Sequence, residues 1–105
     1  MSRDRLSNYS FSRLARLDLI EIADYTVDRW GESQAERYLD GLADCFKLLV
    51  RTPRMGRACD QIRRGYRRVE QGRHVVIYRA DADGIFICRI LHQRMLPETQ
   101  LFEDS

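Results

Sequence analysis

Residues 66–92 read YRRVEQGRHVVIYRADADGIFICRILH, and this stretch decides the fold. Three runs in it are rich in Val, Ile, Tyr and Phe, and short segments of turn-forming residues separate them. This pattern predicts an antiparallel meander with strands over Tyr66–Glu70, His74–Ala80 and Ile85–His92 and turns at 71–72 and 81–84. Gly65 is expected to mark a bulge or a close backbone approach where the first of these strands starts.

The two central strands are apolar on both faces, which is typical of a sheet with something packed against each side. With an even-length loop between them, one face carries Val75, Ile77, Phe86, Cys88 and Ile90. The other face then carries Val76, Tyr78, Ile85, Ile87 and Leu91, together with His74 and Arg89. A pair of helices can cover only one face, so we expect the other to be partly exposed or to meet a partner.

Upstream of the meander, the pattern predicts a short strand and then a helix. Asn8–Ser12 alternates like a strand, and Ser12 is placed to cap the helix that follows. That helix is expected over Arg13–Trp30, with an apolar stripe of Ala15, Leu19, Ile22, Ala23, Thr26 and Trp30. Another face carries four acids, which we interpret as a solvent-exposed stripe: Asp18, Glu21, Asp24 and Asp28.

A second helix is expected soon after the first. Gly31 is a natural helix end, and Ser33 and Glu36 have the spacing of a capping box. The helix is predicted to run to about Arg51, because Pro53 forbids its continuation. So short a link allows only an antiparallel helical hairpin. Residues 53–60 are predicted to be a loop.

The expected fold class is therefore α+β: a short N-terminal strand, an antiparallel helical hairpin and a three-stranded antiparallel meander. A length of 105 residues suits a single domain over residues 1–105, with residues 1–7 and 96–105 as tails. The start of the chain lacks the apolar region of a signal peptide, and no stretch reaches transmembrane length. We expect a cytoplasmic protein that does not interact with membranes.

Three cysteines, Cys45, Cys59 and Cys88, lack the spacing of a metal site, so we expect buried free thiols, no metal and no cofactor. The net charge of +2 is unevenly spread. Residues 1–50 have a balance of −2, whereas residues 51–94 have a balance of +7 in which every base is an arginine. An arginine-rich half suggests an acidic protein segment or a nucleic acid as partner, and an ordinary solvated surface is the alternative.

Catalysis without a metal would require a general base, a general acid and an arginine that holds a phosphate. The residue types are present in His74, His92, Tyr66 and Tyr78, but these are also ordinary structural positions in strands. Arg63 and Arg64 precede Gly65-Tyr66, and Arg67 and Arg68 follow it. Such doubled pairs suit a phosphate or acidic side chains, or they protect an edge strand by charge.

Taken in order, these segments resemble the ParE toxins of bacterial toxin–antitoxin systems, within the RelE/ParE superfamily. The resemblance covers about residues 9 to 96. It rests on residues 15–19 (ARLDL) with Ile22 and Tyr25, residues 30–35 (WGESQA) with Tyr38 and Leu42, Pro53 with Met55-Gly56, Ile62-Arg63 with residues 65–67 (GYR), residues 74–79 (HVVIYR) and residues 89–95 (RILHQRM).

The resemblance implies a toxin that blocks DNA gyrase and is neutralised by a ParD-like antitoxin encoded beside it. It also implies that the complex represses its own operon through the antitoxin, with no sequence-specific DNA binding by the toxin. The action would be protein binding rather than catalysis. The family usually continues its last motif with an Asp, where this chain has Leu96 followed by Pro97.

Two alternatives remain open at this point. RelE relatives cleave mRNA on the ribosome, but an arginine that they need falls here at about Glu70 or Gln71, and no Tyr or His follows His92. A non-toxic binding protein of the same fold is the other alternative. Under the gyrase hypothesis, the candidate partner-binding residues are Arg63, Tyr66, Arg67, His74, Arg79, Arg89, His92, Arg94, Met95 and Leu96.

Overall fold

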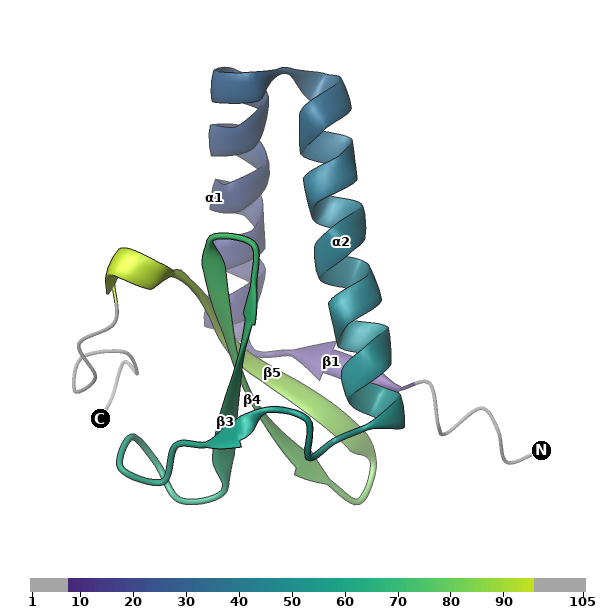
Figure 1. Ribbon diagram of the computed structural model, residues 1–105, viewed down its shortest axis with the longest axis vertical. Coiled ribbons are helices and arrows are strands. Elements are labelled where there is room, and N and C mark those ends of the chain that lie inside the picture. Colours follow the sequence, from purple (N-terminus) through teal and green to yellow (C-terminus); the bar gives the residue numbers. More distant parts are fainter. Residues whose placement is uncertain (1–7, 96–105) are drawn as a thin grey trace.

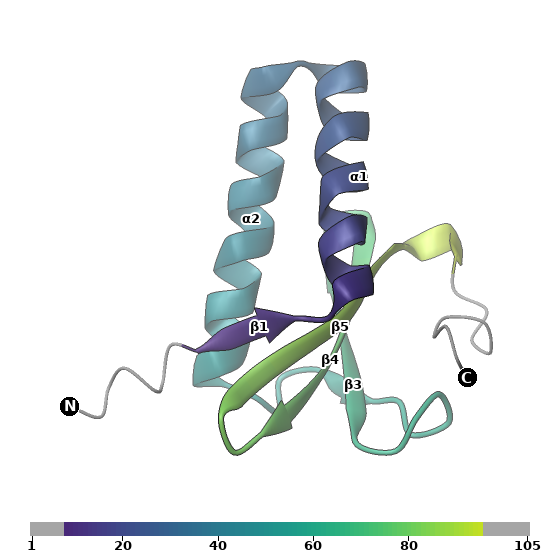
Figure 2. The same cartoon turned by 180° about the vertical axis from the view of Figure 1, so that it is seen from behind.

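Two helices stand on one face of a five-stranded sheet (Figures 1 and 2). The computed structural model describes residues 8–95, so the predicted tails lie outside the described residues. Its elements in chain order are β1 Tyr9–Phe11, α1 Arg13–Trp30, α2 Glu32–Arg51, β2 Arg57–Ala58, β3 Tyr66–Gln71, β4 His74–Asp81, β5 Gly84–His92 and the 3₁₀ helix η2 Gln93–Met95. The predicted α+β class, the helical hairpin and the meander are confirmed.

The sheet has the order β1-β5-β4-β3-β2. Strands β2 to β5 pair antiparallel, whereas β1 pairs parallel to β5, so the sheet is mixed. The pairing of β1 could not be predicted from its three residues, because its partner lies more than 70 residues away along the chain. Strand β2 lies in the segment predicted to be a loop, and its two residues pair with β3.

The predicted cap of α1 is confirmed, and it also fixes the helix to the sheet. The Ser12 hydroxyl accepts a hydrogen bond from the Ala15 N–H at 2.9 Å and donates to the Cys88 carbonyl at 2.8 Å. The Ser12 N–H donates to the Ile87 carbonyl. One residue therefore satisfies an open helix end and holds it against β5.

The predicted capping box is wrong, because Ser33 already lies inside α2. Gly31 is the C-cap of α1 and the N-cap of α2, with φ at +91°. Its N–H donates to the Val27 carbonyl, and its carbonyl accepts from the Ala35 N–H. A single glycine thus makes the whole connection, since it adopts a positive φ without a Cβ clash.

The face assignment of β5 is wrong for two residues. The register of β4 against β5 shifts between Ile77 and Tyr78, and Cys88 is skipped in the pairing. The alternation reverses there, so Ile90 packs with the helices and Leu91 packs on the opposite face. A bulge changes the period of two locally, which no pattern based on regular alternation can reproduce. The predicted position of a bulge, Gly65, is instead a turn residue with φ at +86°.

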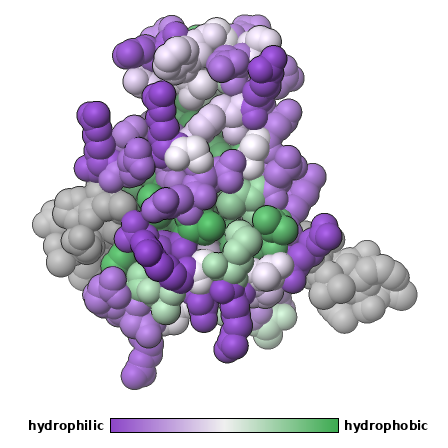
Figure 3. All heavy atoms as spheres, in the orientation of Figure 1, coloured by the Kyte–Doolittle hydropathy of each residue, from purple (hydrophilic) through white to green (hydrophobic). Residues whose placement is uncertain are grey.

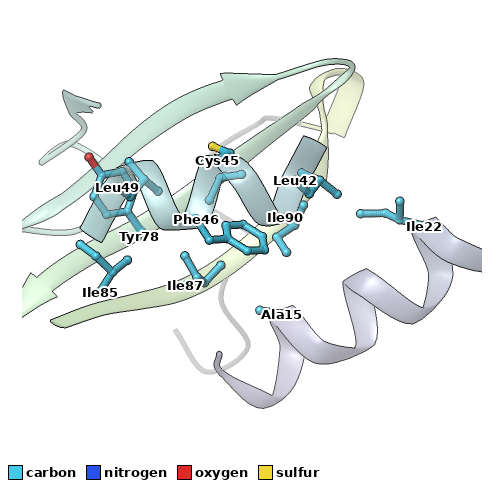
Figure 4. Close-up of a cluster of buried hydrophobic side chains, with 11 residues drawn as sticks. Ala15, Ile22, Leu42, Cys45, Phe46, Leu49, Tyr78, Ile85, Ile87 and Ile90 are labelled. Carbon is cyan, nitrogen blue, oxygen red and sulfur yellow. The ribbon is translucent and has the colours of Figure 1, made fainter. Parts of the chain in front are cut away.

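The main core lies between the helices and the sheet. In Figure 4, Phe46 of α2 points onto Ile87 of β5, with Leu42 and Leu49 on either side. A smaller cluster lies on the other face, where Cys59 and Tyr66 pack on Val75, Ile77 and Leu91. This second face was expected to be partly exposed or to meet a partner, but at its centre the chain itself buries these side chains. The three cysteines are buried free thiols, as predicted.

Tyr78 connects the sheet to the loop after α2, and it is fully buried. Its hydroxyl donates to the Pro53 carbonyl at 2.7 Å and accepts from the Gly56 N–H at 2.9 Å. Gly56 lets the loop approach this closely, since a Cβ there would lie 2.7 Å from the Tyr78 oxygen. Arg67 also donates to the Gly56 carbonyl, at 2.7 Å.

Replacing Tyr78 with Phe is expected to lower the free energy of unfolding by about 2 kcal/mol, because the buried Gly56 N–H and the part-buried Pro53 carbonyl both lose their partner. Urea denaturation measures the change. Tyr25→Phe is the control and is expected to be neutral, since Tyr25 is exposed. Equal stability of the two variants would contradict the role of Tyr78.

Candidate functional site

A groove of about 860 Å³ lies where the helical hairpin rises past the end of the sheet. Residues of α1, the first turns of α2, the β3–β4 turn, the end of β5 and η2 line it. They are Asp18, Glu21, Ile22, Tyr25, Thr26, Trp30, Gln34, Arg37, Tyr38, Arg73, His74, Ile90, Leu91, His92 and Arg94. Three of the predicted partner-binding residues therefore meet in one place: His74, His92 and Arg94.

The wall formed by α1 presents accessible aromatic side chains. Ile22 is buried at its base, while Tyr25 and Trp30 are 54% and 52% exposed. Arginines lie over both rings, with Arg29 at 5.5 Å from the centre of Tyr25 and Arg73 at 5.8 Å from that of Trp30. Two large aromatic side chains left half-exposed beside a groove are typical of a binding surface.

The floor at one end of the groove is a hydrogen-bonded cluster around Tyr38. The Tyr38 oxygen lies 2.6 Å from Nδ1 of His74 and accepts from the Arg73 N–H at 3.0 Å. The His74 ring lies edge-on to the His92 ring, with 5.5 Å between their centres. Gly72 is required here, since a Cβ would lie 2.7 Å from the Tyr38 ring. Tyr38 is half-buried, and no local signal in the sequence indicated its polar contacts.

Burial lowers the pKa of His74, and the nearby His92 and Arg73 lower it further, whereas Asp18 acts in the opposite direction. Burial is also the main cause that raises the pKa of the Tyr38 hydroxyl. His74 is therefore largely neutral, and Tyr38 protonated, near pH 7. Tyr38 and His74 thus form a neutral polar contact beside the positively charged Arg73.

An ion pair joins α1 to β5 beside the groove. Asp18 accepts from Nε and Nη2 of Arg89, both at 2.9 Å, and from the Ile90 N–H at 2.9 Å. The Asp18 and Arg89 side chains are only 11% and 17% exposed. The interpretation of Asp18 as part of a solvent-exposed stripe is therefore wrong. A signal was available, because Asp18 stands three residues after Ala15 and four before Ile22, both in the buried stripe.

Other predicted site residues lie away from the groove. Arg79 stacks on Phe86, 4.4 Å from the ring centre, and donates to the Tyr66 hydroxyl at 3.3 Å. Arg63 lies 5.9 Å from the centre of the Tyr66 ring. These contacts belong to the face opposite the helices, and Arg67 is bound to the loop at Gly56. Met95 ends η2, and Leu96 lies outside the described residues.

Figure 3 shows the surface in the orientation of Figure 1, and hydrophilic side chains cover much of the side that faces the reader. Apolar side chains appear there in a band at the level of the sheet, and hydrophilic ones interrupt it. This broken pattern is ordinary for a protein surface.

The groups proposed for a ribonuclease are not brought together. Tyr78 is fully buried with its hydroxyl bound to the loop, and Tyr66 packs on the face opposite the helices. Only His74 and His92 share a site. Within residues 8–95, three or more potential metal-binding side chains do not cluster anywhere. No helix among the described residues is long and apolar enough to span a membrane.

Fold and groove together define a small two-layer α+β protein with one prominent cleft beside a helical hairpin. Residues 9–97 match the family described as "ParE toxin of type II toxin-antitoxin system, parDE". The chain belongs to the ParE toxin family and is the toxin component of a toxin–antitoxin system.

The sequence comparisons agree with this assignment. Toxin ParE1 of Mycobacterium tuberculosis is 48% identical over 90 residues, which cover 85% of this chain and 92% of the relative. Toxin ParE1 of Caulobacter vibrioides is 40% identical over 87 residues, which cover 83% and 90%. Among solved structures, a chain of the "Chromosomal ParDE TA system from P. aeruginosa" has the same fold. It superposes with a TM-score of 0.70 at 21% identity and covers 84% of this chain and 97% of that one.

Proposed function

We propose that this ParE toxin inhibits DNA gyrase by binding it, and that a ParD-like antitoxin neutralises the toxin by placing a segment in the groove between the helical hairpin and the end of β5. The observation that carries the proposal is the accessible aromatic wall of that groove, formed by Tyr25 and Trp30. The relation to a structure whose title names a ParDE system supports the choice of partner. The proposed place of action is the cytoplasm.

A mechanism by binding, without a catalytic step, is supported by the positions of Tyr66 and Tyr78, which lie away from the His74–His92 pair. A groove of this size suits an amphipathic helix or an extended segment, whose apolar side chains would cover Ile22 and the two aromatic rings. Arg94, His74 and His92 belong to this antitoxin contact. Arg63 and Arg79 lie on another face, beside the buried Tyr66, and we assign these two arginines to the second partner, gyrase. Repression of the operon would then act through the antitoxin of the complex.

Supercoiling of relaxed plasmid DNA by purified gyrase tests the target. The purified toxin is expected to inhibit supercoiling, and the antitoxin encoded in the neighbouring reading frame is expected to restore it. Unimpaired supercoiling together with ribosome-dependent cleavage of mRNA would instead establish the ribonuclease hypothesis. A toxin without effect in either assay would favour a non-toxic binding protein.

Replacing Trp30 with Ala is expected to weaken antitoxin binding by about 2 kcal/mol, roughly thirtyfold in Kd, because large aromatic residues dominate protein interfaces. Isothermal titration calorimetry with the neighbouring antitoxin measures the change. Val27→Ala is the matched control, since Val27 is also exposed on α1 but does not line the groove. Equal affinities of the two variants would place the antitoxin elsewhere.

A further inference from the structure

The two histidines in the groove present hydrogen-bond donors, so the groove favours a ligand that accepts hydrogen bonds. Nδ1 of His92 accepts from the Arg94 N–H at 3.1 Å, which leaves Nε2 of that ring as its hydrogen-bond donor. The Tyr38 hydroxyl is 2.6 Å from Nδ1 of His74 but 3.3 Å from the Gln71 carbonyl. The shorter contact takes the hydroxyl proton, so neutral His74 also carries its proton on Nε2.

Most of the groups that surround these two rings are also hydrogen-bond donors or positively charged. The β3–β4 turn contributes Arg73, η2 contributes Arg94, and α2 contributes Arg37 and the protonated Tyr38. Helix α1 contributes the acids Asp18 and Glu21, and Asp18 is already paired with Arg89. The lining is thus rich in donors and positive charge, so it complements an acceptor that carries a negative charge.

The Tyr38 contact also tolerates a proton on His74. When Nδ1 of His74 carries a proton, it can donate to the Tyr38 oxygen, whose own hydrogen then turns to the Gln71 carbonyl. Protonation therefore rearranges hydrogen bonds without breaking the cluster. What opposes the charged form is burial and the positive charge of the neighbours, and a bound carboxylate offsets both.

From this geometry we infer that His74 and His92, with Arg73 and Arg94 beside them, form a receptor for a carboxylate side chain of the antitoxin segment. The inference rests on the proposed function, since it names the chemistry by which that segment is recognised in the groove. It commits to an Asp or Glu side chain, because both histidines line the groove in which the antitoxin segment is proposed to lie, so a side chain of a bound helix or strand can reach them.

A carboxylate bound beside His74 makes the affinity for the antitoxin depend on pH. Without a ligand, the pKa of His74 is held below its usual value of 6.5. A bound carboxylate raises that pKa, so the complex takes up a proton and affinity increases as the pH falls through the range between the two pKa values. Between pH 7.5 and 5.5, affinity is expected to rise about tenfold, while carboxylates with a pKa of about 4 stay ionised.

Calorimetry tests this with the full-length toxin and the antitoxin of the neighbouring reading frame. Titrations in buffers of different ionisation enthalpy measure the protons taken up on binding. We expect uptake by the unaltered toxin, and its loss together with about a tenfold loss of affinity at pH 5.5 in His74→Gln and His92→Gln. Arg64→Gln, exposed and outside the groove, is the matched control and is expected to change neither quantity.

Neutralising the acidic residues of the antitoxin segment one at a time identifies the ligand. One Asp→Asn or Glu→Gln change is expected to remove the pH dependence with the unaltered toxin and to have little further effect with His92→Gln. A pH dependence that survives every such change would overturn the assignment to a side chain and point to the terminal carboxylate. Binding without proton uptake would overturn the receptor and leave the proposed function intact.

Absence of antitoxin binding would contradict the proposed function, and acetate then tests the receptor alone. Acetate is expected to raise the pKa of the His74 ring, followed by its NMR signals, above the value in chloride at equal ionic strength. Equal pKa values in the two salts would overturn the inference without reference to any antitoxin.

Discussion

Asp18→Ala is expected to lower the free energy of unfolding by about 3 kcal/mol, because it leaves the Arg89 guanidinium buried without its counter-charge. The same change removes the acceptor of the Ile90 N–H at the bulge of β5. For a domain of this size, such a loss corresponds to a fall in Tm of roughly 15 °C. Urea denaturation and calorimetric melting measure the two quantities.

Two further variants separate the ion pair from the packing of α1. Asp24→Ala removes an exposed acid from the same helix and is expected to change stability by less than about 0.5 kcal/mol. Combining Asp18→Leu with Arg89→Met removes both charges and is expected to be less destabilising than Asp18→Ala, because no unpaired charge remains. A loss below about 1 kcal/mol in Asp18→Ala would contradict the role of the pair in joining α1 to β5.

Gly84→Ala is also expected to lower the free energy of unfolding by about 3 kcal/mol, through backbone strain and a collision together. Gly84 has a φ of +136°, a conformation that residues with a Cβ rarely adopt. An added Cβ would meet the Asn8 carbonyl oxygen, which accepts from the Ile85 N–H where β1 meets β5. The change therefore opposes the parallel pairing of β1.

Gly65→Ala is the matched control for this second prediction. Gly65 also has a positive φ, +86°, but an added Cβ would meet no atom within 4 Å. We expect a loss of about 1 kcal/mol from strain alone, so the difference between the two variants measures the collision. Hydrogen exchange of the amides of β1 and β5 provides a second readout, with faster exchange expected in Gly84→Ala only. Equal losses in both variants would contradict the collision.

Periodicity was sufficient for the helices and the meander. Leu42, Phe46 and Leu49 recur at helical steps in α2, and β4 is a run rich in Val, Ile and Tyr. Neither signal requires knowledge of the residues that pack against it. The fold class rested on such patterns and the family resemblance on ordered sequence motifs, and both are confirmed. The predicted capping box was wrong because both Gly31 and Ser33 are residue types that occur at helix ends, and Gly31 is the N-cap of α2 in the structure.

The candidate site was only partly predictable. His74, His92 and Arg94 were expected to contact a partner, and the fold brings them to one groove. Tyr25 and Trp30, which form its accessible wall, were not on the list of site residues. On a helical pattern, an aromatic side chain at the edge of a stripe looks the same whether it is buried or half-exposed. Whether such a side chain is buried or half-exposed depends on where the neighbouring strand, β5, ends.

The amino-acid sequence by itself predicted the two helices, β1, the three meander strands and their order, because turns, caps and apolar periods act over a few residues. Its ordered motifs indicated the family. Tertiary structure decided the parallel pairing of β1, the reversal of Ile90 and Leu91 at the bulge, the pairing of Asp18 with Arg89 and the existence of the groove. Each of these depends on contacts between segments far apart in the chain. Their register and distance follow from packing of the whole core, which no local pattern contains.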